Sequence, residues 1–182
     1  EFKRGVDYIE LRPDRAGTHD IGGPMAIIQF LSSGKERIAL PAALVCDHLV
    51  QANVGAIPDL KVAEKGNVET YEFLRDVSRR YGFDFWPAGS GICHQVFMEN
   101  YNFPGCMMLV TDSHTPTACG MGMLAIGVGG ADLVDALMGM EWELKMPKII
   151  GVNLTGQLQG WASAKDVILK LTGMLSTKGA TN

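Results

Sequence analysis

Segments with strand character alternate along this chain with segments that have a helical pattern, and polar loops follow several of the strands. The apolar run 106–110 has the length of a strand and leads into the polar segment 111–117. Before it, the strand-like segment 83–86 is separated from that run by 92–100, which begins as a helix would. Alternation of this kind is typical of sheets whose parallel strands are joined by crossover helices. The sequence therefore predicts an α/β fold, a three-layer α/β/α domain with a largely parallel sheet.

Two helices are marked more clearly than the rest. Apolar residues recur at intervals of three or four over 67–81, which indicates one buried helical face, and a glycine follows. We predict Asn67 as the N-cap of this helix. The last helix is expected over 163–175, with Ser163 as its cap and Asp166 as a capping-box partner.

The other expected elements have weaker signals. The first 23 residues are polar and are broken by Pro13 and by glycines, which favours an irregular segment. The remaining patterns predict helices over 25–31 and 130–138, and strands over 38–40, 44–46 and 148–154.

Charge and cysteine usage limit the classes of function. Sixteen Lys and Arg against twenty Asp and Glu give a formal charge of −4, which lacks the basic character typical of nucleic-acid binding. The longest apolar runs are too short to span a bilayer. We therefore expect neither a nucleic-acid partner nor a membrane span. None of the four cysteines lies in a C-x-x-C pair, and we expect all four to be buried, reduced thiols.

Ligands of parallel sheets bind beyond the carboxyl ends of the strands, so the loops after strands are the candidate sites. Asp47 and His48 directly follow the expected strand 44–46. An aspartate beside a histidine can orient the ring for general acid–base work, although neighbours on a strand point to opposite faces and need a turn to cooperate. The alternative is a surface aspartate beside a partly buried histidine.

Two further loops carry chemistry. Asp112, Ser113 and His114 share the loop 111–117, and His94 follows a glycine-rich turn in 89–95 that can direct backbone amides at an anion. A Ser-His-Asp triad is disfavoured, because adjacent triad members do not normally align. The pattern favours a polar pocket that binds carboxylates and moves protons, and plain turns are the alternative.

Eight segments, in order and over nearly the whole chain, resemble the aconitase family. The most specific of them is TDSHTP at 111–116. The glycine-rich segment 127–132 superficially resembles a dinucleotide fingerprint, but we expect only a helix N-terminus there. The other seven are LRPDR at 11–15, CDHL at 46–49, GSGICHQ at 89–95, ENY at 99–101, GVGGAD at 127–132, WELK at 142–145 and KDVILK at 165–170.

The resemblance implies a hydro-lyase of the mitochondrial matrix that interconverts citrate and isocitrate through cis-aconitate. It also implies a [4Fe-4S] cluster, one iron of which acts as a Lewis acid on the substrate. Asp47 and His48 would form the acid pair that assists loss or return of hydroxide. The resemblance assigns support of the substrate and the iron-bound water to His94, Asp112 and His114, and contact with a substrate carboxylate to Ser113.

The chain departs from the family at two positions. Family members usually read D-A-T-A-Q where this chain reads D-I-G-G-P at 20–24, so Pro24 replaces a glutamine. They usually have asparagine at the position of Thr117. The family's cluster cysteines, substrate-binding arginines and serine base come from later segments, and the four cysteines here match none of those motifs.

We therefore expect 1–182 to be a single, incomplete first domain that is inactive alone and lacks the cluster ligands. The alternatives are a catalytically silent aconitase-derived subunit, held with other chains in a larger assembly, and a hydratase acting on a related substrate.

Overall fold

The computed structural model describes residues 2–176 and 178–179. The chain divides into two compact units, a large one over 10–142 and a small one formed by 1–9 and 143–182. The assignment of the whole chain to a single domain stays a prediction.

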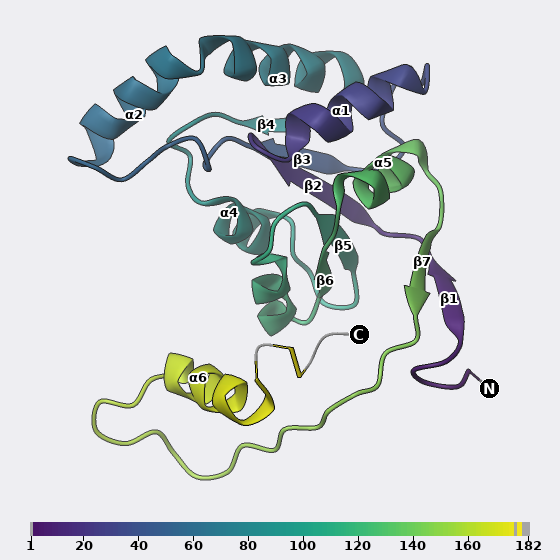
Figure 1. Cartoon of the computed structure of the whole chain (residues 1–182), viewed down its shortest axis with the longest axis vertical. Helices are drawn as coiled ribbons and strands as arrows, with labels where there is room; N and C mark the ends of the chain where they lie inside the picture. Colours follow the sequence, from purple (N-terminus) through teal and green to yellow (C-terminus); the bar gives the residue numbers. More distant parts are fainter. Residues whose placement is uncertain (1, 177, 180–182) are drawn as a thin grey trace. The chain divides into compact units, whose positions relative to one another are not determined.

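The large unit is built on one sheet of five parallel strands (Figure 1). Their order across the sheet is β4-β3-β2-β5-β6, so the chain runs outward from β2 to β4 and then returns to the other side of β2. The topological switch point therefore lies between β2 and β5, where open α/β sheets bind ligands. The strands are β2 (Arg15–His19), β3 (Ala42–Val45), β4 (Asp84–Trp86), β5 (Met107–Val110) and β6 (Leu124–Gly127).

Helices cover both faces of this sheet, as Figure 1 shows, and the predicted three-layer α/β architecture is confirmed. On one face pack α1 (Gly23–Ser32), α3 (Val68–Tyr81) and α5 (Gly130–Met138). On the other face pack α4 (Cys93–Asn100) and the 3-10 helix η1 (Thr115–Met121).

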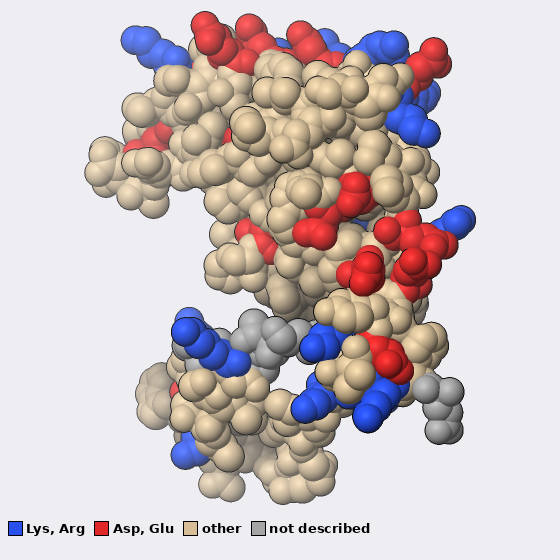
Figure 2. Space-filling model, turned by 45° about the vertical axis from the view of Figure 1, so that its right-hand side comes forward, with Lys and Arg blue, Asp and Glu red and all other residues tan. Residues whose placement is uncertain are grey.

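The helix α2 (Ala56–Gly66) leads directly into α3. Acidic and basic side chains are interspersed along the outer surface of these two helices in Figure 2, as expected for solvated helix faces.

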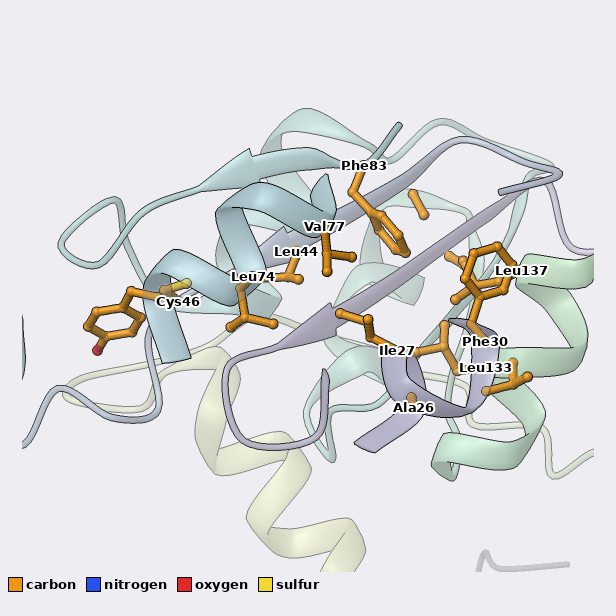
Figure 3. Close-up of a cluster of buried hydrophobic side chains, with 14 residues drawn as sticks. Ala26, Ile27, Phe30, Leu44, Cys46, Leu74, Val77, Phe83, Leu133 and Leu137 are labelled. Carbon is orange, nitrogen blue, oxygen red and sulfur yellow. The ribbon is translucent and has the colours of Figure 1, made fainter. Parts of the chain in front are cut away.

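The larger hydrophobic core lies between the sheet and the helices α1, α3 and α5 (Figure 3). Phe30 of α1, Leu44 of β3, Leu74 of α3 and Leu133 of α5 are each fully buried there. Burying a side chain of this size contributes about 1.5–3 kcal/mol. This core fixes the positions of the strands and, with them, the loops at the carboxyl end of the sheet.

The central strand β2 lies within the first 23 residues, where an irregular segment was predicted, and that prediction is wrong. The sequence RAGTH has little β-propensity, but β3 and β5 pair with it on both sides. Small residues are needed here because α4 packs closely. A Cβ on Gly17 would come within 2.2 Å of the Phe97 ring. Tertiary packing therefore overrides local propensity at this strand.

The predicted strand 38–40 is also wrong, because its backbone amides bond to helix ends. The amide of Ile38 donates to the carbonyl of Tyr81 at the end of α3, and that of Ala39 donates to Leu137 in α5. The strand β3 begins only after Pro41, and it ends one residue before the predicted 44–46 does.

Asn67 was predicted to cap α3, but its side chain makes no capping hydrogen bond to that helix. Its Nδ2 instead donates to the carbonyl of Ala63, 2.9 Å away, at the end of α2, a helix that was not predicted. The predicted end of α3 is confirmed, because Gly82 has the left-handed conformation with φ 94°.

The small unit contains most of a two-stranded sheet, β1 (Tyr8–Leu11) with β7 (Trp142–Lys145), and the helix α6 (Ala164–Leu175). The predicted capping box is confirmed, since Asp166 accepts from the Ser163 amide at 2.7 Å. The predicted strand 148–154 is wrong, because this segment has no regular structure and β1 pairs with β7 instead. Among the described residues, no helix combines the length and apolar character needed to cross a bilayer.

Candidate functional site

A cavity of about 690 Å³ opens at the carboxyl end of the sheet in the large unit. Five of the six predicted site residues line it, and Ser113 does not. The sheet topology explains this convergence, because the loops after β3, β4 and β5 emerge at the same edge. The described lining consists of Asp47, His48, Val50, Gly89, Gly91, Ile92, His94, Asp112 and His114.

Asp47 and His48 form a hydrogen-bonded pair. The chain turns after β3, which removes the obstacle that strand neighbours face in opposite directions, and brings Nδ1 of His48 to 2.7 Å from Oδ1 of Asp47. The second oxygen of Asp47 accepts the Cys93 amide at 2.7 Å, at the N-terminus of α4. These two bonds hold the Asp47 carboxylate between the His48 ring and the N-terminus of α4.

Asp112 is the most buried carboxylate lining the cavity, with 3% of its surface exposed. Its Oδ2 accepts the backbone amide of His114 at 2.8 Å. Its carboxylate also lies between two imidazoles, with Oδ1 3.6 Å from Nε2 of His48 and Oδ2 3.7 Å from Nδ1 of His94. These last two distances are too long for direct hydrogen bonds. A protonated ring on either side would find a counter-charge here.

His94 and His114 both line the cavity, and their ring centroids lie 5.0 Å apart. His94 stands in the first turn of α4, as predicted, and its buried Nδ1 has no hydrogen-bond partner among the described residues. Ser113 is exposed and lies 3.1 Å from Nδ1 of His114. The turn before α4 requires glycine, because Gly89 and Gly91 have φ values of 89° and 137°.

Sequence reasoning did not assign two residues at the end of β2. The buried carboxylate of Asp20 accepts the amides of His48 and Leu49, at 2.9 and 3.2 Å. The ring of His19 stacks on that of His48, and burial lowers the pKa of His19. The available signal was a polar His-Asp pair directly before a glycine turn and a helix, which marks a strand end in this fold.

The cysteines follow the prediction in part. Cys46, Cys93 and Cys106 are buried, whereas Cys119 is exposed and the prediction for it is wrong. Burial raises the pKa of Cys46 to about 12 and also raises the pKa values of Cys93 and Cys106, which favours neutral thiols. Three groups of described residues have the spacing of metal ligands, and each contains at most one cysteine.

Neither departing position is among the described residues that line the cavity. Pro24 occupies the first turn of α1, where its missing amide costs nothing, and Thr117 is exposed in η1. The glycine-rich segment 127–132 forms a helix N-terminus, as expected, with Asp132 accepting the Gly129 amide at 3.2 Å.

Comparison with known proteins adds a family to this geometry. A family model described as "Aconitase family (aconitate hydratase)" matches residues 1–182. The chain is 54% identical over 181 residues to the mitochondrial aconitate hydratase of Candida albicans, and equally to that of Saccharomyces cerevisiae. It is 53% identical over 178 residues to the mitochondrial aconitate hydratase of Gracilaria gracilis.

These matches cover nearly all of the chain but only part of each relative. The matches to the Candida albicans and Saccharomyces cerevisiae proteins cover 100% of the chain, and the match to the Gracilaria gracilis protein covers 98% of it. It spans only 23% of the length of each of these three relatives.

Proposed function

The chain belongs to the aconitase family, and on that premise we propose that it supplies acid/base and carboxylate-binding loops of a hydro-lyase. The reaction proposed is the interconversion of citrate and isocitrate through cis-aconitate. The names of the relatives also support a mitochondrial location. The observation that carries the proposal is the Asp47–His48 pair, which lines one cavity with His94, Asp112 and His114.

His48 is proposed as the acid that assists departure of the hydroxyl group. Its Nδ1 is engaged by Asp47, so the ring presents Nε2 to the side of Asp112 and the cavity. During dehydration the protonated ring gives its Nε2 proton to the hydroxyl, which leaves as water. A base outside this chain takes the proton from the neighbouring carbon, so that the electron pair of that C–H bond forms the double bond, and hydration reverses both transfers. Asp47 holds the ring in one orientation and stabilises its charged form. Positioned acids and bases of this type contribute roughly 10²–10⁴-fold to a rate.

The remaining site residues are proposed to bind the substrate. His94 and His114 offer ring nitrogens at the cavity to an anionic ligand, and the buried Nδ1 of His94 lacks a partner in the described chain. Ser113 bonds with the His114 ring and lies outside the cavity lining, so we propose that it reaches a carboxylate only at the rim. Asp112 holds the loop through the His114 amide.

The family's iron–sulfur cluster does not fit the cysteines described here. Such clusters are held by several thiolates converging on one centre. The described ligand groups contain at most one cysteine each, and burial favours the neutral thiol at Cys46 and Cys93. The proposed chemistry of this chain is therefore limited to its own carboxylates, imidazoles and hydroxyls.

A segment exchange tests the proposal. The 181 matching residues of the Saccharomyces cerevisiae enzyme are replaced by this chain, and formation of cis-aconitate from citrate is followed by its ultraviolet absorbance. We expect turnover that depends on His48. A folded, cluster-loaded hybrid without turnover would contradict the proposal.

The alternative is a catalytically silent subunit held with other chains in a larger assembly. Pro24 favours it, because proline has no side-chain donor at a position where the family carries glutamine. Within the same hybrid, Pro24→Gln and Thr117→Asn distinguish the two proposals. Silence relieved by these two substitutions supports the alternative, and turnover without them supports the hydro-lyase. Turnover on another hydroxy-tricarboxylate, with none on citrate, supports the related hydratase.

A further inference from the structure

His19 contacts the acid pair but takes no part in the proposed proton transfer. Its ring lies flat on that of His48, with centroids 3.7 Å apart and an interplanar angle of 15°. Only 6% of His19 is exposed, whereas 32% of the His48 side chain is exposed. The buried His19 ring therefore packs against one face of the more accessible His48 ring.

The hydrogen bonds of His19 define its tautomer. Its Nε2 lies 2.8 Å from the carbonyl of Thr111, which can only accept, so this nitrogen carries a proton. Its Nδ1 lies 3.3 and 3.4 Å from the amides of Ile21 and Gly22, which can only donate. Protonating both nitrogens would set an N–H against these amides. The geometry accordingly gives a neutral ring, and burial together with the His48 charge lowers the His19 pKa in agreement.

The same bonds fix the ring in space. Thr111 follows β5, whereas Ile21 and Gly22 belong to the turn between β2 and α1. His19 is thus attached to both strand ends that border the switch point. Tilting the ring would lengthen or break these hydrogen bonds, so they oppose its rotation.

The ionisable groups around the stacked rings are mainly acidic. Asp47 bonds to His48, and Asp112 lies 3.6 Å from its Nε2. Asp20 binds the backbone amides below the ring, and Cys93 is a buried thiol with a raised pKa. A charged His19 would repel a protonated His48, and a neutral one does not.

We propose that His19 is a positioning residue for His48. Its fixed, neutral ring holds the plane of the His48 ring, so that Nδ1 meets Asp47 and Nε2 faces Asp112 and the cavity. The catalytic meaning of this role rests on the proposed function, because His48 is itself a proposed acid. Stacked aromatic rings attract each other beyond the effect of burial alone, so the contact favours a parallel arrangement of the two rings.

Nitrogen-15 NMR of the histidine-labelled chain tests the proposal without substrate or turnover. At about pH 8, where ordinary histidines are neutral, we expect His48 as a single tautomer protonated at Nδ1. His19→Phe keeps a flat ring and should preserve that tautomer. His19→Gln keeps an amide for hydrogen bonding but has no ring, and the single His48 tautomer should be lost. Unchanged signals of His94 and His114 show that each variant is folded.

An unchanged His48 tautomer in folded His19→Gln would overturn the proposal, as would equal loss in both folded variants. If neither variant folds, the wild-type chain decides. His19 should remain neutral and protonated only at Nε2 at about pH 6, and protonation of both nitrogens there would overturn the proposal. An inactive hybrid enzyme would reject the proposed function and leave this result standing, so the two failures are distinguishable.

Discussion

Oδ1 of Asp47 lies 2.7 Å from Nδ1 of His48, while the other oxygen of Asp47 accepts the first amide of α4 at the same distance. One carboxylate therefore joins the loop after β3 to the helix that carries His94. The orientation of the His48 ring depends on its hydrogen bond to Asp47 and on stacking against the ring of His19. The acid pair is thus part of the packing of the sheet edge, and the following predictions separate its structural and chemical contributions.

Asp112→Ala should destabilise the chain by about 1–3 kcal/mol, because it removes the buried carboxylate that accepts the His114 amide. Urea unfolding measures the change. The matched control is Ser113→Ala in the same loop. Loss of this exposed hydroxyl should lower the free energy of unfolding by no more than about 0.5 kcal/mol. Equal losses at the two positions would contradict the structural role of the Asp112 carboxylate.

Gly17→Ala should destabilise the chain by about 1–3 kcal/mol, because the added methyl group overlaps the Phe97 ring. Phe97→Leu removes part of that ring and should recover some of the loss when combined with Gly17→Ala. Unfolding of the single and double variants in urea gives the coupling between them. Strictly additive losses would show that α4 does not approach β2 as closely as the structure indicates.

Stability should fall as the pH drops below about 6.5, the ordinary pKa of histidine, because the His19 pKa is lowered in the folded chain. The unfolded chain then binds a proton that the folded chain resists, so the contribution present at higher pH is lost as the pH falls through the folded value. Asp59 titrates in a separate, more acidic window, since hydrogen bonds lower its pKa below 3.8.

The measurement for this window is the urea midpoint at about pH 7.5 and about pH 5.5, compared between the wild-type chain and His19→Gln. The variant should show a smaller change between the two pH values. A difference equal to that of the wild type would assign the pH dependence to other groups.

Alkylation should modify Cys119 first, because it is the exposed thiol among the four cysteines. Cys46 and Cys93 should react only after unfolding, since both are buried with raised pKa values. Peptide mass spectrometry after a timed reaction with iodoacetamide gives the order, and Cys119→Ser should abolish the fast phase. Fast labelling of Cys93 in the folded chain would contradict the closed packing at the start of α4.

The sequence was sufficient to predict the α/β architecture and the clustering of Asp47, His48, His94, Asp112 and His114. Both follow from local signals, namely apolar runs of strand length followed by polar loops, and from the rule that parallel strands end at one edge. Whether these residues take part in catalysis stays a prediction.

The sequence could not reveal β2 or the role of His19. The strand consists of small residues and owes its conformation to β3, β5 and the close approach of Phe97. His19 gains its significance from Thr111 and His48, which are distant in the chain. The strand predicted for 38–40 was wrong for the same reason, because carbonyls at helix ends accept the hydrogen bonds of its backbone amides. Long-range pairing decided each of these positions.

The most direct test of the acid pair is Asp47→Asn in the hybrid enzyme described above. Asparagine preserves the shape but removes the charge that holds and stabilises protonated His48, so kcat for citrate dehydration should fall by roughly 10²–10⁴-fold with KM little changed. Ser113→Ala should act mainly on KM. An Asp47→Asn hybrid that keeps the kcat of its parent would contradict the proposed role of the pair.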